Sequence, residues 1–160
     1  SLKNFGIVSQ KEVDYIGGNA KVDEFRAAIG LCNLEIVSDE IKKRKKVFER
    51  YEKNLRGIKG IRLNFKQEDV IQNYAYFPVL FDSYKLTRDQ VFNLLKENEI
   101  YARKYFYPLT SDFNAYKIGF KISDTLVASK ITNNILCLPM YADLELDNVD
   151  RVCKIIKEGR

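Results

Sequence analysis

The sequence predicts an α/β fold, with the α+β-like character of a small domain in which a small, mostly antiparallel sheet is covered by helices. Three observations lead to this class. Strand-like segments alternate with amphipathic helical segments along the chain, and the connections between them are of mixed length. The 160 residues suffice for one domain with a sizeable core. A content of 46% hydrophobic and 31% charged residues is typical of a globular protein and not of a disordered chain.

The composition excludes several kinds of site. The chain has no histidine, which removes Ser-His and Cys-His nucleophilic sites and most transition-metal sites, so we expect no metal site. Cys32, Cys137 and Cys153 lie far apart in apolar patterns, and we expect buried free thiols in a reducing compartment, the cytoplasm. No apolar run approaches the roughly 18 residues that span a bilayer, so we expect no membrane partner. The net charge of +5 is compatible with an anionic small molecule or with nucleic acid.

Residues 15–30 combine a glycine pair with the start of a helix. Gly17 and Gly18 predict a tight turn that presents Asn19, and Asp23 is placed to cap the helix that follows. A glycine turn that opens a helix can hold an anion, because free N–H groups and the helix dipole point outward. An ordinary corner between a loop and a helix is the alternative, and the local pattern by itself favours that alternative.

Two helices are predicted before Gly57. In the first, apolar residues recur at three- and four-residue steps, which predicts one buried face. A break is expected near residues 35–38, where Ser38 would cap a second, longer helix that ends at Gly57. The first apolar face consists of Phe25, Ala28, Ile29 and Cys32, and the second of Ile41, Phe48, Tyr51 and Leu55.

The strongest charge run is Lys-Lys-Arg-Lys-Lys at residues 42–46. A patch that binds phosphate or nucleic acid is one interpretation. However, five consecutive positions cover about 400° of a helix with 3.6 residues per turn, so these charges do not form one stripe. Acidic residues nearby on the helix can pair with them, and a solvated helix face is therefore the favoured interpretation.

The middle of the chain predicts two strands and a helix. Residues 61–64 alternate and predict a short strand, and residues 74–82 have high strand propensity. Pro78 cannot donate to a neighbouring strand, which predicts a bulge or an edge position. Thr87 is the expected N-cap of a helix over residues 88–98.

Residues 100–109 predict a strand that runs into a loop fixed by Pro108. Two cations and two phenols follow one another there, at Arg103, Lys104, Tyr105 and Tyr107. A guanidinium can bind a carboxylate or phosphate through two parallel hydrogen bonds, and a phenol can stack or donate. Such a strand could also bind single-stranded nucleic acid. An edge strand with outward charges is the alternative, and the residues of this segment do not decide between them.

The remaining elements are a helix, a strand and a helix. We expect a helix over residues 123–133 and a short buried strand over residues 135–139, which Pro139 stops. Gly159 follows an amphipathic C-terminal helix. The apolar face of that helix consists of Leu146, Val149, Val152, Cys153 and Ile156.

Three segments taken together resemble one family of enzymes. They are GGNAKVDEFRAAIGL at residues 17–31, IYARKYFYPL at residues 100–109, and ILCLPMY at residues 135–141 followed by DNVDRV at residues 147–152. In order and approximate spacing they resemble the pyridoxal-phosphate-dependent sugar aminotransferases of the DegT/DnrJ/EryC1/StrS group. The resemblance extends over nearly the whole chain.

The resemblance implies part of a fold type I transferase, with residues 1–35 at the end of the large cofactor domain. Residues 36–160 would form the C-terminal small domain with its long connecting helix. The parent enzyme would be a cytoplasmic homodimer of polysaccharide biosynthesis that uses pyridoxal 5′-phosphate (PLP). It would transfer an amino group, typically from glutamate, to a keto carbon of a nucleotide-linked sugar. The chain starts without Met and its first residues resemble the middle of a longer sequence, so we expect an excised fragment, and the resemblance implies that it is the C-terminal part.

The resemblance places the family's Schiff-base lysine, and the groups that hold the PLP ring, before Ser1. It therefore implies that the chain contains no catalytic residue, does not bind PLP and is inactive by itself. Asn19 matches the asparagine that reaches the cofactor phosphate of the neighbouring subunit, and its amide can donate to a phosphate oxygen. Arg103 matches a basic position near the substrate pocket, where it would suit a nucleotide diphosphate or the glutamate carboxylate. Tyr105 and Tyr107 would line the same pocket.

Two other functions stay open. A basic nucleic-acid-binding domain would use residues 42–46 and 103–107, and its affinity would fall steeply with salt concentration. With the resemblance in view, nucleic acid is not the expected partner. A structural or dimerisation module would form a stable dimer and bind neither ligand.

Overall fold

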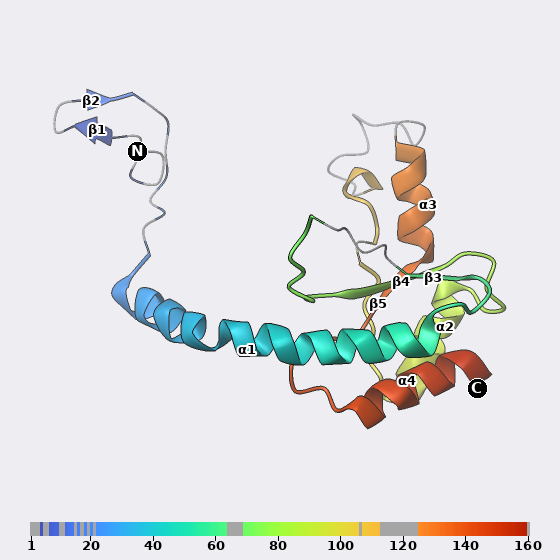
Figure 1. Ribbon diagram of the computed structural model, residues 1–160. Coiled ribbons are helices and arrows are strands. Elements are labelled where there is room, and N and C mark those ends of the chain that lie inside the picture. The colour runs from blue at the N-terminus through green and yellow to red at the C-terminus, as the bar shows by residue number, and fades with distance from the viewer. Residues whose placement is uncertain are drawn as a thin grey trace. The chain divides into compact units, whose positions relative to one another are not determined.

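The computed structural model describes residues 4, 7–9, 12–14, 16, 18, 20, 22–63, 69–105, 107–112 and 125–159. The chain divides into two compact units, Ser1–Asp39 and Glu40–Arg160. Figure 1 shows the elements of each unit in order along the chain. The expected boundary after residue 35 concerns the domains of a longer protein, and it stays a prediction.

The long helix α1 (Glu24–Leu55) is continuous over 32 residues, so the expected break near residues 35–38 is wrong. Ser38 and its neighbours are only mildly unfavourable inside a helix, by less than about 1 kcal/mol each, and neither proline nor glycine interrupts residues 31–55. The predicted start is confirmed, because the carboxylate of Asp23 accepts a hydrogen bond of 2.9 Å from the backbone N–H of Arg26. Gly57 follows the helix with φ +80°, a conformation that suits glycine.

In the first unit, strands β1 (Ile7–Ser9) and β2 (Glu12–Val13) pair antiparallel, and the first turns of α1 follow. The predicted buried face of these turns is wrong for the residues described, because their apolar side chains are exposed. Cys32 is exposed too, against the expectation of a buried thiol. Apolar residues surround this half of the helix and do not form one stripe, so no single face is available to be buried. The exposed apolar residues are Phe25, Ile29, Leu31, Leu34, Ile36 and Val37.

The second unit is built on a three-stranded antiparallel sheet of β3 (Ile61–Leu63), β4 (Phe77–Phe81) and β5 (Ile135–Leu138), in the order β3-β4-β5. The predicted mostly antiparallel sheet is confirmed among the described residues. The two outer strands are far apart in the sequence and come together only through β4. The register pairs Ile61 with Phe81, and Phe77 with Leu138.

Pro78 lies in the central strand without a bulge, so the predicted edge or bulge is wrong. Cys137, which lies opposite Pro78, directs its own N–H and C=O to Arg103 on the far side of β5. The nitrogen of Pro78 therefore points toward the β3 side, at a level beyond Leu63, the last residue of β3. No ladder hydrogen bond of the described strands is lost there, which explains how a central strand contains a proline.

Three helices of the second unit match their predicted positions. They are α2 (Arg88–Glu97), α3 (Leu126–Asn134) and α4 (Leu146–Glu158), and the 3₁₀ turn η1 (Thr110–Asp112) lies between α2 and α3. Thr87 caps α2 in a capping box, in which the backbone N–H of Gln90 donates to Thr87 and the backbone N–H of Thr87 donates to the Gln90 side chain. Gly159, with φ +74°, ends α4 as expected.

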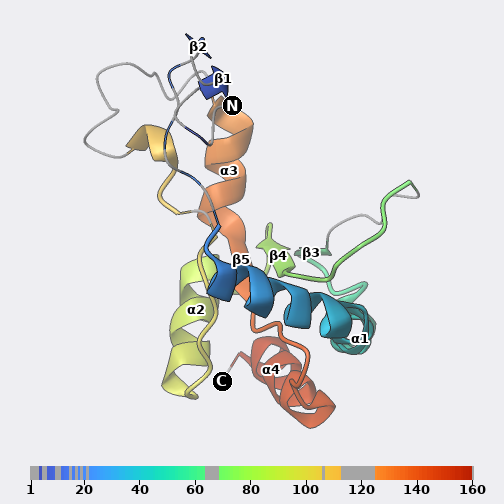
Figure 2. The same ribbon diagram turned by 90° about the vertical axis from the view of Figure 1, so that its left-hand side faces the viewer.

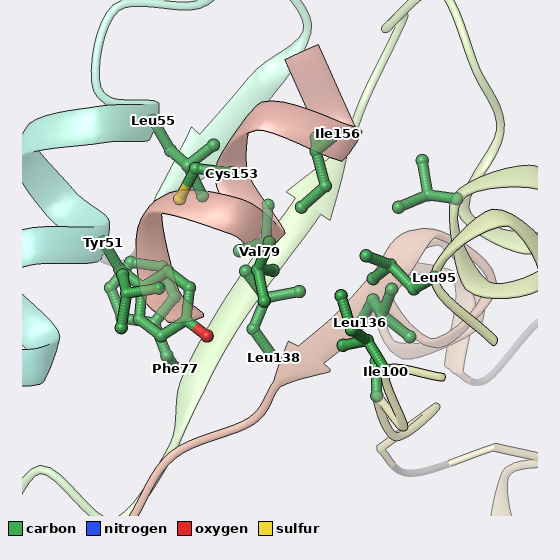
Figure 3. Packing of buried hydrophobic residues seen from close by; sticks show 14 of the residues in the cluster. Tyr51, Leu55, Phe77, Val79, Leu95, Ile100, Leu136, Leu138, Cys153 and Ile156 are labelled. Atoms are coloured by element: carbon green, nitrogen blue, oxygen red, sulfur yellow. The ribbon is translucent and has the colours of Figure 1, made fainter. Parts of the chain in front are cut away.

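The core lies on one face of the sheet. Alternate residues of β4 and β5 point to this face, and α1, α2 and α4 cover it, as Figure 3 shows for the side chains that meet there. The ring of Tyr51 from α1 stacks on Phe77 from β4, with centroids 4.8 Å apart. The core consists mainly of Val47, Tyr51, Leu55, Phe77, Val79, Phe81, Val91, Leu95, Leu136, Leu138, Val149, Val152, Cys153 and Ile156.

Candidate functional site

The structure brings three of the four predicted site residues into one segment beside β5. Arg103 forms an isolated antiparallel bridge with Cys137, with N–H···O distances of 2.9 and 2.8 Å. Tyr105 and Tyr107 follow it within a few residues. Asn19 lies outside the described residues.

The predicted strand over residues 100–109 is wrong, because the described residues of this segment pair only in this one bridge. An antiparallel ladder would next need the backbone groups of Pro139 on one side and Ile135 on the other. Pro139 has no N–H. The N–H of Ile135 already donates to Ile131, and its carbonyl accepts from the guanidinium of Arg88 at 3.3 Å. Neither position can extend the ladder.

Arg103 and Tyr105 form the first half of the candidate site together with Tyr76, which precedes β4. The phenol oxygens of Tyr76 and Tyr105 are 3.4 Å apart, and their ring centroids are 5.1 Å apart. The Arg103 guanidinium lies 5.5 Å from the Tyr105 ring centroid. The hydrogen bond with Tyr105 raises the pKa of the Tyr76 phenol. Tyr76 was missed as a site residue because only the fold brings it beside Tyr105, 29 positions further on.

Tyr107 and Lys104 form the second half, which rests against the start of α2. The Arg88 guanidinium lies 4.7 Å from the Tyr107 ring centroid. The Lys104 amine lies 2.6 Å from a carboxylate oxygen of Asp89 and 4.6 Å from the ring centroid of Phe92. The hydrogen bond from Lys104, with a smaller contribution from Arg88, lowers the pKa of Asp89. Lys104 is therefore a paired cation and not a free amine.

The two halves have different chemical capacities. Arg103, Tyr76 and Tyr107 are exposed, so a guanidinium and phenol rings are open to a ligand. A guanidinium beside aromatic rings suits a ligand that combines an anionic group with a planar or apolar ring. Arg88 is buried and Lys104 is partly buried, and their contacts hold the segment against α2.

A hollow of about 320 Å³ lies elsewhere in the second unit, and none of the predicted site residues lines it. Buried apolar residues of the core form part of its wall. Tyr101 and Tyr141 are largely exposed beside it. The hollow is lined by Glu99, Ile100, Tyr101, Pro139, Tyr141, Leu144, Asn148, Arg151 and Val152.

Two lysines of the basic run at residues 42–46, Lys43 and Lys45, form ion pairs. The Lys43 amine contacts Glu40 at 3.1 Å and Asp143 at 3.0 Å, and these carboxylates raise the pKa of Lys43. Lys45 lies 3.9 Å from a carboxylate oxygen of Glu49. These pairs favour the interpretation of the run as a solvated helix face.

The described residues contain no group of three or more acidic or cysteine side chains arranged for a metal ion. Within the same residues, no helix has the length and apolar character needed to cross a membrane. Cys137 and Cys153 are buried free thiols, as predicted. Burial raises the pKa of both, that of Cys153 to about 12, which keeps these thiols protonated and unreactive at neutral pH.

Lys104, the lysine of the candidate segment, is not placed to react with PLP. That cofactor requires a free amine for its aldehyde and an anionic partner for its ring nitrogen. The lysine of the candidate segment, Lys104, is held by Asp89 and lies over an aromatic ring. No step of PLP chemistry is therefore assigned to these side chains.

Comparison with known proteins gives a family and a fold. The model of the DegT/DnrJ/EryC1/StrS aminotransferase family matches residues 1–157. A dTDP-4-amino-4,6-dideoxy-D-glucose transaminase of Shigella dysenteriae is 38% identical over 158 residues, which cover 98% of this chain and 43% of that protein. A GDP-perosamine synthase of Vibrio cholerae is 28% identical over 98% of this chain and 43% of its own length. The crystal structure of S. venezuelae DesV with a ketimine intermediate superposes with a TM-score of 0.84, at 22% identity, over 98% of this chain and 42% of that one.

These matches confirm the predicted fold class and the family resemblance. The chain spans less than half the length of the relatives it matches. What the matched part contributes must therefore be argued from its own residues.

Proposed function

The chain belongs to the DegT/DnrJ/EryC1/StrS aminotransferase family, and we propose that it forms the C-terminal part of a PLP-dependent sugar aminotransferase. The complete enzyme transfers an amino group, with glutamate as the expected donor, to a keto sugar linked to a nucleotide. The observation that carries this proposal is the family match over residues 1–157, together with a relative of 38% identity that is a dTDP-sugar transaminase.

In this proposal the chain binds and orients substrate. Arg103 is exposed beside the paired phenols of Tyr76 and Tyr105, so its guanidinium can bind a diphosphate or a carboxylate while a ring stacks against the phenols. Tyr107 extends the same surface. These side chains provide charge and orientation, and residues outside this chain provide the amine that reacts with the cofactor.

The PLP contact that we propose for this chain is Asn19. A side-chain amide can donate to an oxygen of the cofactor phosphate. In the proposed homodimer Asn19 serves the site of the neighbouring subunit, so the 160-residue chain by itself does not hold the cofactor. The proposed place of action is the cytoplasm.

The test uses the complete reading frame that contains this chain. The full-length protein is expected to show the visible absorption band of enzyme-bound PLP, and the 160-residue chain is expected to show none. Full-length protein that never acquires this band contradicts the proposal. Loss of the band on Asn19→Ala, with dimer formation retained, identifies Asn19 as a cofactor residue.

Arg103→Ala tests the substrate contact separately. Loss of a charge-assisted hydrogen bond costs about 1.5–3 kcal/mol, so KM for the nucleotide sugar is expected to rise roughly 10- to 150-fold. The matched control is Arg62→Ala, which removes an exposed, ion-paired arginine from β3 and is expected to leave KM unchanged. Equal KM values for the two variants would assign the anion contact to another residue.

A further inference from the structure

Arg88 is a cation in the interior of the second unit. Its side chain is 2% exposed, and among the described residues it is the largest of the fully buried side chains. Burial of a charge is costly unless hydrogen bonds and opposite charges compensate for it. The contacts of Arg88 should therefore explain why a charged side chain is buried at this position.

The contacts of Arg88 join three parts of the chain. From the first turn of α2, one of its guanidinium nitrogens donates to the carbonyls of Thr132 at 3.0 Å and Ile135 at 3.3 Å, where α3 ends and β5 begins. Its Nε lies 2.7 Å from a carboxylate oxygen of Asp89. Its guanidinium also lies 4.7 Å from the ring centroid of Tyr107. Figure 2 shows α3 leading into β5, with α2 nearby.

Asp89 extends this arrangement to a second residue of the candidate segment. The same carboxylate oxygen that contacts Arg88 also contacts the Lys104 amine at 2.6 Å. Lys104 packs over the ring of Phe92, one turn further along α2. The candidate segment is thus held on α2 at Lys104 and at Tyr107, on either side of Tyr105.

Fold stability alone does not account for a buried arginine in this position. An apolar side chain of similar volume often stabilises a buried site as well as an ion pair does, or better. What an apolar side chain cannot do is donate to two carbonyls while it holds a carboxylate and lies over a ring. These contacts fix the orientation of the groups that Arg88 touches, which are the Asp89 carboxylate and the Tyr107 ring.

We propose that Arg88 is a positioning residue: it fixes the Tyr107 ring directly and Lys104 through Asp89, and thereby sets the direction in which Arg103 and Tyr105 face a ligand. The consequence for substrate binding rests on the proposed function. The positioning itself is a property of the chain and can be measured without any substrate.

The experiment compares Arg88→Met, Arg88→Lys and the matched control Arg62→Met, which removes an exposed arginine paired with Asp82. Two-dimensional NMR spectra of tyrosine-labelled protein report the ring environments. In Arg88→Met the Tyr107 signal is expected to move toward the position of a free tyrosine, while the signal of Tyr51 in the core stays in place. Arg88→Lys keeps the positive charge but loses the several N–H donors of the planar guanidinium, so an intermediate Tyr107 signal is expected. Arg62→Met is expected to change neither signal.

An unchanged Tyr107 signal in Arg88→Met overturns the positioning role. A displaced Tyr51 signal means that the variant disturbs the core, and the role is then decided on Asp89→Asn, which removes the carboxylate that joins Arg88 to Lys104. In that variant a shift of the Lys104 side-chain resonances supports the role, and unchanged resonances overturn it.

The link to function uses dTDP as the probe in the full-length protein. Arg88→Met is expected to weaken dTDP binding at least tenfold and to change kcat by less than threefold, because positioning acts on binding. Wild-type protein that binds neither dTDP nor GDP contradicts the proposed function and leaves the positioning role to be judged on the NMR signals. Wild-type binding that Arg88→Met does not weaken overturns the link between positioning and substrate.

Discussion

Replacement of Gly60 by alanine is expected to destabilise the second unit more than any other glycine substitution with a described environment. Gly60 has φ +83°, and a Cβ atom added there would lie 2.5 Å from the backbone nitrogen of Tyr84 and 2.6 Å from the carbonyl oxygen of Ser83. Real Cβ atoms do not approach backbone atoms so closely. The obstructing atoms belong to the main chain, so no side-chain rotation can relieve the contact.

Gly57 provides a control that separates the two causes of strain. Its φ of +80° is nearly the same, but a Cβ atom added there meets nothing within 4 Å. Gly57→Ala therefore measures the left-handed backbone penalty, about 1 kcal/mol. Gly60→Ala adds an overpacking penalty of about 1–3 kcal/mol, which gives a total of about 2–4 kcal/mol.

The assay is urea unfolding followed by circular dichroism. With a slope of about 2 kcal/mol per M, the midpoint is expected to fall by about 0.5 M for Gly57→Ala and by about 1–2 M for Gly60→Ala. The hydrogen bond of 2.9 Å from Asp82 to the Gly60 carbonyl joins the ends of β3 and β4, so any relief by backbone movement would weaken the sheet. Equal midpoints for the two variants would refute the close approach of Gly60 to Tyr84.

Three further predictions concern charge, polarity and reactivity. The hydrogen bonds from Arg50 and the Asn54 amide lower the pKa of Asp150 to about 2. This carboxylate therefore stabilises the fold above the unfolded-state pKa of about 4, and the stabilisation is lost as pH falls to about 2. Melting curves between pH 2 and 7 should show a shallower loss of stability in acid for Asp150→Asn. The phenol oxygen of Tyr51 is buried without a hydrogen-bond partner among the described residues. Tyr51→Phe should therefore leave the free energy of unfolding unchanged or raise it by up to about 1 kcal/mol, and a decrease of more than about 1 kcal/mol would contradict the absence of a partner. With a thiol reagent at pH 8, exposed Cys32 should react within minutes and Cys153 only on unfolding, and Cys32→Ser should remove the fast phase.

Local patterns predicted the elements of the second unit well, because each depends on residues close together in the sequence. The N-cap at Thr87 and the glycine after α4 are local signals, and both were confirmed. The break predicted near residues 35–38 shows the limit of such signals. Polar residues there resembled a cap, but a cap needs a chain that leaves the helix, and nothing in the sequence of α1 forces it to leave.

The errors at Pro78 and in residues 100–109 have a different cause. Whether a proline fits a strand depends on which neighbour its nitrogen faces, and the neighbours of β4 come from distant parts of the chain. Likewise, the segment around Arg103 has strand propensity, but the N–H and C=O of Ile135 in its potential partner β5 are hydrogen-bonded to Ile131 and Arg88. The composition of a segment does not reveal which backbone groups of its partner strand are already hydrogen-bonded.

The candidate site was predicted in part for the same reason. Arg103, Tyr105 and Tyr107 are adjacent in the sequence, so their clustering was visible, whereas Tyr76 and Arg88 join them only through the fold. One signal for Arg88 was nevertheless present. A cation at the first residue of a helix opposes the positive end of the helix dipole, and an unfavourable choice of this kind needs a reason elsewhere.

Two departures from local rules lie beside the candidate site, and two further residues with positive φ, Ser83 and Glu99, lie outside it. Arg88 opposes the dipole of α2, and Tyr74, two residues before Tyr76, has φ +51°, a conformation that a non-glycine residue adopts at a cost of about 1–3 kcal/mol. The ring of Tyr74 packs edge-on against Phe48, with centroids 5.3 Å apart, which anchors this strained residue to the core. Sequences usually agree with local preferences except where function requires otherwise. Backbone strain at Tyr74 and a buried cation at Arg88 thus flank the aromatic side chains of the candidate site, an arrangement that agrees with the proposed recognition of a ring-bearing anion.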